Sequence, residues 1–166
     1  MWYRSIEELR GLRVTDAEVA ELAKAREAGL SDAACIELVR IARQRNQPFA
    51  SGNAIVELRR TAVSEPTIVE LARLNQLGPW VGEAQAMRLA GLSDQTLLSV
   101  ARRRAAGQAV LSGPFIAQLK NAGLSEAEIL ELIARGTTDA QAEAMLAARQ
   151  RAAGSTGFVR YPRRRR

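Results

Sequence analysis

A segment of about 61 residues occurs twice in this chain, and no other feature of the sequence constrains the fold as strongly. Residues 28–32 (AGLSD) recur at 90–94 with an offset of 62, and residues 51–71 recur in similar form at 112–132 with an offset of 61. Repetition at such a period is typical of arrays in which a unit cannot bury its apolar face alone and stacks on the next unit. The sequence therefore predicts a tandem duplication.

Each predicted copy, at about 16–76 and 79–137, divides again at a recurring turn. An apolar residue followed by serine marks this turn four times, at Leu30-Ser31, Val63-Ser64, Leu92-Ser93 and Leu124-Ser125. Each serine is expected to accept a hydrogen bond from a free N–H group in the first turn of the helix that follows. At three of the turns a glycine, which tolerates the left-handed conformation that ends a helix, stands two positions earlier (Gly29, Gly91 and Gly123). The pattern predicts a helix, a tight turn and a helix, four times over.

Further capping signals complete the prediction of an all-α fold. Reciprocal capping boxes are expected at Thr15/Glu18, Ser125/Glu128, Thr138/Gln141 and Ser5/Glu8. No stretch alternates apolar and polar residues with a period of two, so no sheet is predicted. The predicted helices are 5–11, 16–28, 32–45, 52–62, 65–75, 80–90, 94–106, 113–122, 126–135 and 139–152.

These helices predict four helical hairpins stacked as a short α-solenoid, with an extra helix at each end, and a compact helical bundle is the alternative. Residues 1–152 are interpreted as the helical repeat domain, with 5–11 and 139–152 as its flanking helices. Residues 153–166 lack periodicity and are predicted to be a disordered, arginine-rich tail. Trp80 is expected to be a core anchor at the junction between the copies.

The residue inventory argues against catalysis. Among the 166 residues there is no histidine and one cysteine, Cys35. Histidine-based triads, an intrachain disulfide and cysteine-rich zinc sites are therefore excluded, and Cys35 is expected to be buried. The carboxylates lie scattered on predicted polar faces, so we expect no enzyme, no metal and no cofactor. No segment reads as a signal peptide or a membrane span, and the expected location is the cytoplasm.

The net positive charge comes from the C-terminal end of the chain. Lys+Arg is 24 and Asp+Glu is 18, which gives +6, and residues 151–166 hold six arginines and no acid. Residues 1–150 are therefore formally neutral, with 18 residues of each sign. The tail combines arginines, which neutralise phosphates, with two aromatic rings, which can stack on unpaired bases. Its candidate anion-binding residues are Phe158, Arg160, Tyr161, Arg163, Arg164, Arg165 and Arg166.

A second basic cluster, Arg102, Arg103 and Arg104, closes the helix predicted at 94–106. Cations at a helix C-terminus interact favourably with the helix dipole, which explains the cluster without a ligand. A secondary phosphate-binding patch is the functional alternative. Arginines outnumber lysines 22 to 2, and codon bias toward arginine accounts for this as readily as phosphate binding does.

The expected function is that of a non-enzymatic interaction module. Its helical surface would bind a protein, and its tail would contact an anionic partner such as RNA or DNA. The alternative is a self-associating structural protein, whose tail aids solubility or docks on an acidic protein. Because the flanking helices are suited to covering the ends of the repeats, a monomer is the favoured state.

Overall fold

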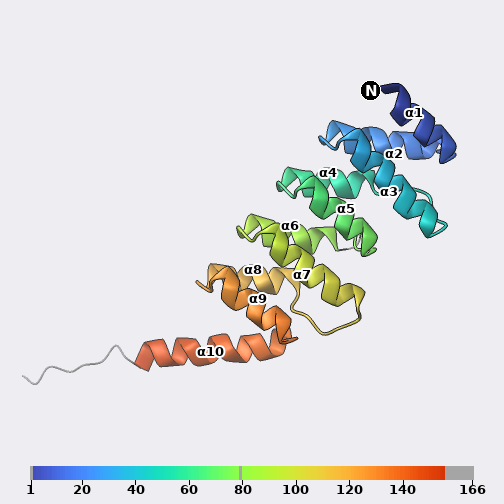
Figure 1. The fold of residues 1–166 in the computed structure, drawn as a ribbon. Coiled ribbons are helices and arrows are strands. Elements are labelled where there is room, and N and C mark those ends of the chain that lie inside the picture. Colours follow the sequence, from blue (N-terminus) through green and yellow to red (C-terminus); the bar gives the residue numbers. More distant parts are fainter. Residues whose placement is uncertain (1, 79, 156–166) are drawn as a thin grey trace, which may run out of the picture.

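The computed structural model describes residues 2–78 and 80–155, with side chains described for 7–78 and 80–152. This part of the chain forms ten α-helices and no strand, so the predicted all-α class is confirmed (Figure 1). The helices are α1 (Trp2–Gly11), α2 (Asp16–Glu27), α3 (Asp32–Gln44), α4 (Gly52–Arg60), α5 (Glu65–Arg73), α6 (Val81–Leu89), α7 (Asp94–Ala105), α8 (Gly113–Asn121), α9 (Glu126–Ala134) and α10 (Asp139–Ser155).

The helices lie in two rows (Figure 1). In the odd row α1, α3, α5, α7 and α9 pack on one another in that order, and in the even row α2, α4, α6 and α8 do the same. α10 follows α8: at the start of α8, Ser112 donates hydrogen bonds from its N–H and its hydroxyl to the carboxylate of Asp139, at 2.9 and 2.7 Å. Consecutive helices of the chain therefore alternate between the rows, and each hairpin stacks on the next.

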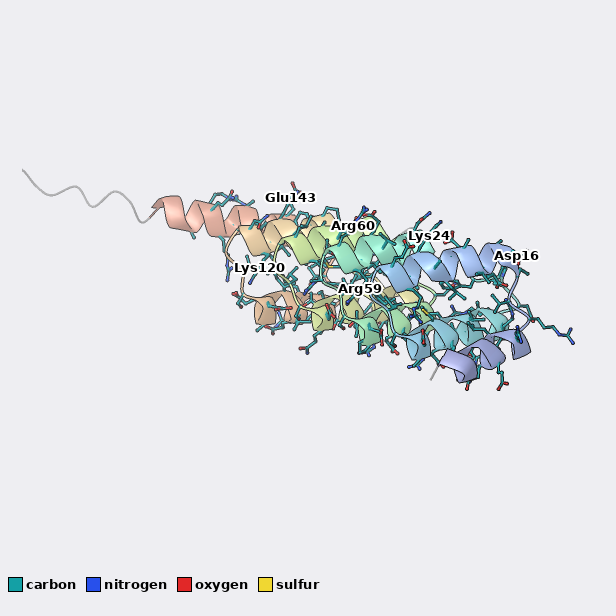
Figure 2. All side chains as sticks on the ribbon, turned by 90° about the horizontal axis from the view of Figure 1, so that it is seen from above. Asp16, Lys24, Arg59, Arg60, Lys120 and Glu143 are labelled. Carbon is teal, nitrogen blue, oxygen red and sulfur yellow. The ribbon has the colours of Figure 1, made fainter. Side chains whose placement is uncertain are left out.

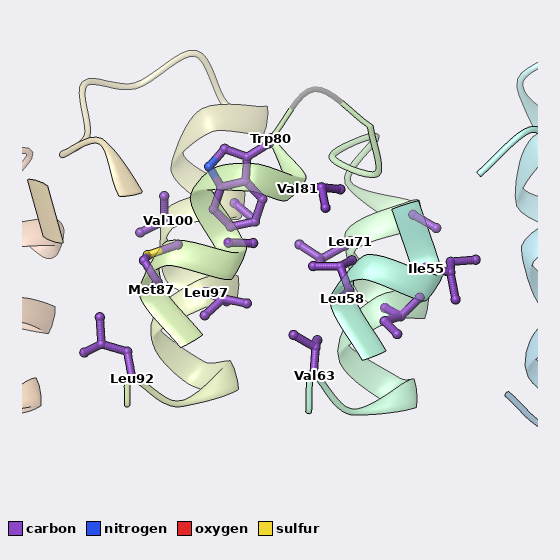
Figure 3. Close-up of a cluster of buried hydrophobic side chains, with 14 of the residues drawn as sticks. Ile55, Leu58, Val63, Leu71, Trp80, Val81, Met87, Leu92, Leu97 and Val100 are labelled. Carbon is purple, nitrogen blue, oxygen red and sulfur yellow. The ribbon is translucent and has the colours of Figure 1, made fainter. Parts of the chain in front are cut away.

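The hydrophobic core runs between the two rows. Each helix buries one apolar stripe, as in α3, where Cys35, Leu38 and Val39 at positions i, i+3 and i+4 are buried. Cys35 is thus buried as predicted, and burial raises the pKa of its thiol. In the middle of the array the side chains of four helices meet, among them Leu58, Met87 and Leu97 (Figure 3). Trp80 is 3% exposed within this cluster, which confirms it as a core anchor.

Most of the predicted turn chemistry is present. Gly29, Gly91 and Gly123 have φ values of 89°, 81° and 89°, in the left-handed region that favours glycine. The capping boxes of Thr15/Glu18 and Ser125/Glu128 are complete. Ser31 accepts a hydrogen bond from the N–H of Ala34, as expected of a cap. The local signals that separate the helices are therefore read correctly at these positions.

Three expectations about helix ends are wrong. α1 begins at Trp2, so Ser5 lies inside it and cannot be its cap. Ser64 and Ser93 precede α5 and α7 but accept no capping bond, because their hydroxyls donate to side chains instead. α10 continues to Ser155, three residues past the predicted boundary, because alanines in its last turns favour the helix.

Arginine side chains tie the ends of neighbouring helices together. The Arg59 guanidinium, on α4, donates to the carbonyl oxygen of Ala28 beyond α2 at 3.2 Å, and Arg88, on α6, donates to Thr61 beyond α4, also at 3.2 Å. In the odd row Arg45 donates to the carbonyl oxygen of Ala72 in the last turn of α5, at 2.7 Å. A guanidinium offers five donors in a fixed fork, which suits the free carbonyls at a helix C-terminus better than an ammonium group does. This structural use accounts for several body arginines.

Candidate interaction surface

The tail residues proposed from the sequence lie outside the described part of the chain. They are Phe158, Arg160, Tyr161, Arg163, Arg164, Arg165 and Arg166. Their binding of an anion stays a prediction.

The side chains of the second basic cluster, Arg102–Arg104, turn to different partners. Arg102 pairs with Glu70 on α5, at 3.6 Å. Arg103 donates to the carbonyl oxygen of Ala134, at the end of α9, at 3.1 Å. Both contacts hold a neighbouring helix of the odd row, so a structural role accounts for these two cations. Binding of phosphate by this cluster also stays a prediction.

Arg104 belongs to a pair that recurs along the chain with different chemistry. It donates to both carboxylate oxygens of Glu83 at 3.1 Å, and its guanidinium lies 5.9 Å from the centre of the Trp80 ring. Sixty-two residues before Trp80 stands Glu18, and sixty-one before Arg104 stands Arg43; these two form an ion pair with contacts of 2.6 and 2.7 Å. The first half of the array thus uses a salt bridge where the second uses a cation–π contact.

The buried carboxylates act as struts within the fold. Glu18 is 1% exposed, and its hydrogen bonds from Arg43 lower the pKa of its carboxyl group far below the ordinary value, against the opposing effect of burial. Burial raises the pKa of Glu126, but hydrogen bonds from Ser93 and Thr96 outweigh it and lower that pKa overall. Carboxylates with lowered pKa values and occupied oxygens are weak general bases at neutral pH.

Two further searches of the described residues gave no site. No three His, Cys, Asp or Glu side chains in this part of the chain are placed to hold a metal ion. None of its helices is both long and apolar enough to cross a membrane.

The outer face of the odd row carries a ladder of ion pairs. Each step joins a glutamate of one helix to an arginine of the next: Glu8 to Arg40, Glu37 to Arg73 and Glu70 to Arg102, at 3.6, 3.0 and 3.6 Å. Pairs this exposed stabilise a fold by only ~0.5 kcal/mol each, and they leave the surface polar and well solvated. This face has the character of an ordinary solvated surface.

The outer face of the even row changes character along the array. On α2 and α4 it is charged: Lys24, Glu27 and Arg60 line a cavity of about 540 Å³ between these helices. Figure 2 shows Lys24 and Arg60 on this side of the molecule. Lys24 pairs with Glu21 and Arg60 with Glu57, both at 2.5 Å, so these cations are balanced within their own helices.

On α6 and α8 the same face carries no charged side chain at any of its eight outward positions. These residues, here called the α6–α8 patch, are exposed or half-buried: Gly82, Gln85, Ala86, Leu89, Pro114, Ala117, Gln118 and Asn121. The two helices pack directly on each other, so the patch is continuous. Leu89 stands in it with 80% of its surface exposed, the largest fraction among the exposed large hydrophobic residues of the described chain. Charged residues make up 25% of the sequence, and their absence here resembles the centre of a protein–protein interface.

The sequence analysis did not identify the α6–α8 patch. Its members come from two helices and align only when residues 82–89 are set against 114–121, an offset of 32 that differs from the 61-residue period. Half of a predicted amphipathic helix is expected to be polar, so an exposed leucine is visible only once the buried side is known. The aligned helices do carry one usable signal, which is the absence of charge.

No protein-family model, curated protein or solved structure matches this chain.

Proposed function

We propose that this protein is a non-enzymatic, cytoplasmic interaction module that binds a protein partner through the α6–α8 patch. In this proposal the arginine-rich tail contacts an anionic partner, with RNA or DNA as the leading case. Together the patch and the tail would bring a protein and a polyanion onto one small helical scaffold.

The exposure of Leu89 is the observation that carries the proposal. A leucine that is 80% exposed contributes nothing to the core, and it sits among small and uncharged side chains that cost little to dehydrate. Burying such a side chain against a partner contributes roughly 2 kcal/mol. The rest of the body supports the same reading, because its buried carboxylates and many of its arginines are engaged within the fold.

We further propose that the scaffold is a short α-solenoid that arose by duplication of about 61 residues. Equivalent contacts on either side of the midpoint support this. Gly52, at the start of α4, donates its N–H to Glu21 at 2.8 Å, and Gly113, at the start of α8, donates to Glu83 at the same distance. These pairs lie 61 and 62 residues apart, which are the offsets of the sequence repeat.

Affinity capture with a matched set of variants tests the proposed partner surface. The full chain, Leu89→Glu and Val19→Glu are each immobilised and exposed to lysate, and the retained proteins are quantified by mass spectrometry. Val19 is the control because it is also an exposed hydrophobic residue, 54% exposed, but lies on α2 away from the patch. We expect at least one protein to be retained by the full chain and by Val19→Glu but lost with Leu89→Glu. Identical retention by all three would refute the proposed surface.

A further inference from the structure

The two rows of helices end out of step with each other. At the N-terminal side of the array the odd row starts with α1, which packs on α3 without an even-row helix beside it. At the other side α10 extends the even row past α9, the last odd-row helix of the described residues (Figure 1). One end therefore shows an unmatched odd-row helix, and the opposite end shows an unmatched even-row helix.

At the α10 end, the place of the next odd-row helix is an apolar slot. A cavity of about 190 Å³ lies between α9 and α10, with Leu132, Met145 and Leu146 among its lining residues. Met145 is 49% exposed there, although Ala142 one turn earlier is fully buried. Further back in the array the matching leucine of α5, Leu71, is 1% exposed, and α7 packs on α5. The slot thus has the packing chemistry of an interior step of the odd row.

At the α1 end, the apolar counterpart is Val19 on α2. Glu21 faces α4, because its carboxylate accepts the N–H of Gly52. Val19 precedes Glu21 by two residues, which is about 200° around a helix, so it points away from α4 and toward the place of a preceding even-row helix. It is 54% exposed. Of the three exposed large hydrophobic residues in the described chain, Val19 and Met145 thus stand at the two open ends, while Leu89 belongs to the α6–α8 patch.

We propose that the occupant of each end is a second copy of this chain, joined head to tail. In the joint, α1 of one copy lies against α9 and α10 of another and continues the odd row, with Met145 beneath it. α10 in turn lies against α2 of the first copy and continues the even row, covering Val19. The contact repeats the helix stacking within the chain, and both copies keep their α6–α8 patches free.

Ionic contacts along the odd row support this continuation. At three successive steps a glutamate of one helix pairs with an arginine of the next. On α9 the corresponding glutamate, Glu131, pairs with Arg135 of its own helix and lies on the rim of the slot. α1 brings Arg10 in its last turn, which supplies the cation for one more step. A joint of this kind is heterologous, since the two copies use different surfaces, and it therefore builds open chains or rings.

Sedimentation velocity of the full chain at rising concentration tests the joint, with three charge-introducing variants. Val19→Glu and Met145→Glu each place an unpaired carboxylate in the joint, whereas Leu89→Glu places one outside it. All three positions are exposed and glutamate favours helices, so circular dichroism should show the native fold. We expect the average mass of the full chain and of Leu89→Glu to rise with concentration up to roughly 1 mM, the range in which weak contacts are populated. Each end variant alone should stay monomeric.

Mixing the two end variants distinguishes head-to-tail from symmetric association. Val19→Glu retains an intact α10 end and Met145→Glu retains an intact α1 end, so an equimolar mixture should form a dimer and nothing larger. Three results would overturn the proposal: a full chain that stays monomeric throughout, an end variant that still self-associates, or a mixture that remains monomeric. None of them bears on capture of a protein by the α6–α8 patch, which is measured with Leu89→Glu.

Discussion

At the scale of single residues, Glu18 shows how a charged group is placed inside this small helical array. Its carboxylate is 1% exposed, accepts the Phe49 N–H at 2.8 Å and pairs with two nitrogens of Arg43. Removing the charge of one partner leaves the other without compensation, so Glu18→Gln should lower the free energy of unfolding at neutral pH by about 3 kcal/mol. Urea denaturation measures this, with the exposed Glu27→Gln as the control, for which a change within ~0.5 kcal/mol is expected.

The same carboxylate predicts how stability depends on acid. Its pKa is lowered by folding from an ordinary value of 4.5, so the unfolded chain takes up a proton before the folded one. The stabilisation it supplies is complete above this ordinary pKa and is lost as the pH falls below it toward the lowered value. Glu18→Gln should therefore lose stability less steeply than the parent chain below pH 4.5. Parallel acid limbs for the two proteins would show that Glu18 is not the titrating group.

At the scale of helices, the start of α8 is a point of close approach. A Cβ atom on Gly113 would lie 2.5 Å from the Cβ of Glu83 and 2.7 Å from its carbonyl oxygen. Gly113→Ala should therefore push α8 away from α6 and cost about 2 kcal/mol, although alanine is the better helix former. The control is Gly82→Ala in the first turn of α6, where the added methyl group meets nothing within 4 Å. There we expect unchanged or raised stability, by up to about 1 kcal/mol. Thermal melts that ranked the variants the other way would contradict the packing of α8 on α6.

Helices are also the scale at which the sequence was most informative. Local signals such as Gly29 at a turn and the capping box of Thr15 act within a few residues, so they can be recognised along the chain. The partners of the arginines cannot: Arg59 and the carbonyl oxygen it binds at Ala28 lie 31 residues apart. The exposure of Leu89 likewise depends on how α6 is turned against its neighbours, which amphipathic spacing alone does not determine.

At the scale of the whole molecule, the balanced body places the excess charge in the tail, and this predicts how nucleic acid would bind. Arg160 and Arg163–Arg166 can contact up to five phosphates, so the slope of log affinity against log salt concentration should reach at most roughly −3.5 for single strands and −4.5 for duplexes. Binding should be largely independent of base sequence. Titration at several salt concentrations checks both points.

Deletion of residues 158–166 is the control for that titration. It should abolish most of the binding and leave the helix content and the melting temperature nearly unchanged, since these residues lie outside the ten described helices. Replacing Phe158 and Tyr161 with alanine should weaken single-strand binding more than duplex binding, because stacking requires unpaired bases. If the truncated chain binds RNA and DNA as well as the full chain does, the tail is not the anchor.

The partner surface remains the central claim for the molecule as a whole, and the affinity of a captured partner for Leu89→Glu tests it most directly. Isothermal titration of the purified partner with the full chain, Leu89→Glu and Val19→Glu gives the three dissociation constants under one condition. Replacing a buried leucine contact with a charge should raise the dissociation constant of Leu89→Glu by about tenfold or more, and Val19→Glu should match the full chain. Equal dissociation constants for the full chain and Leu89→Glu would contradict the assignment of the α6–α8 patch as the binding surface.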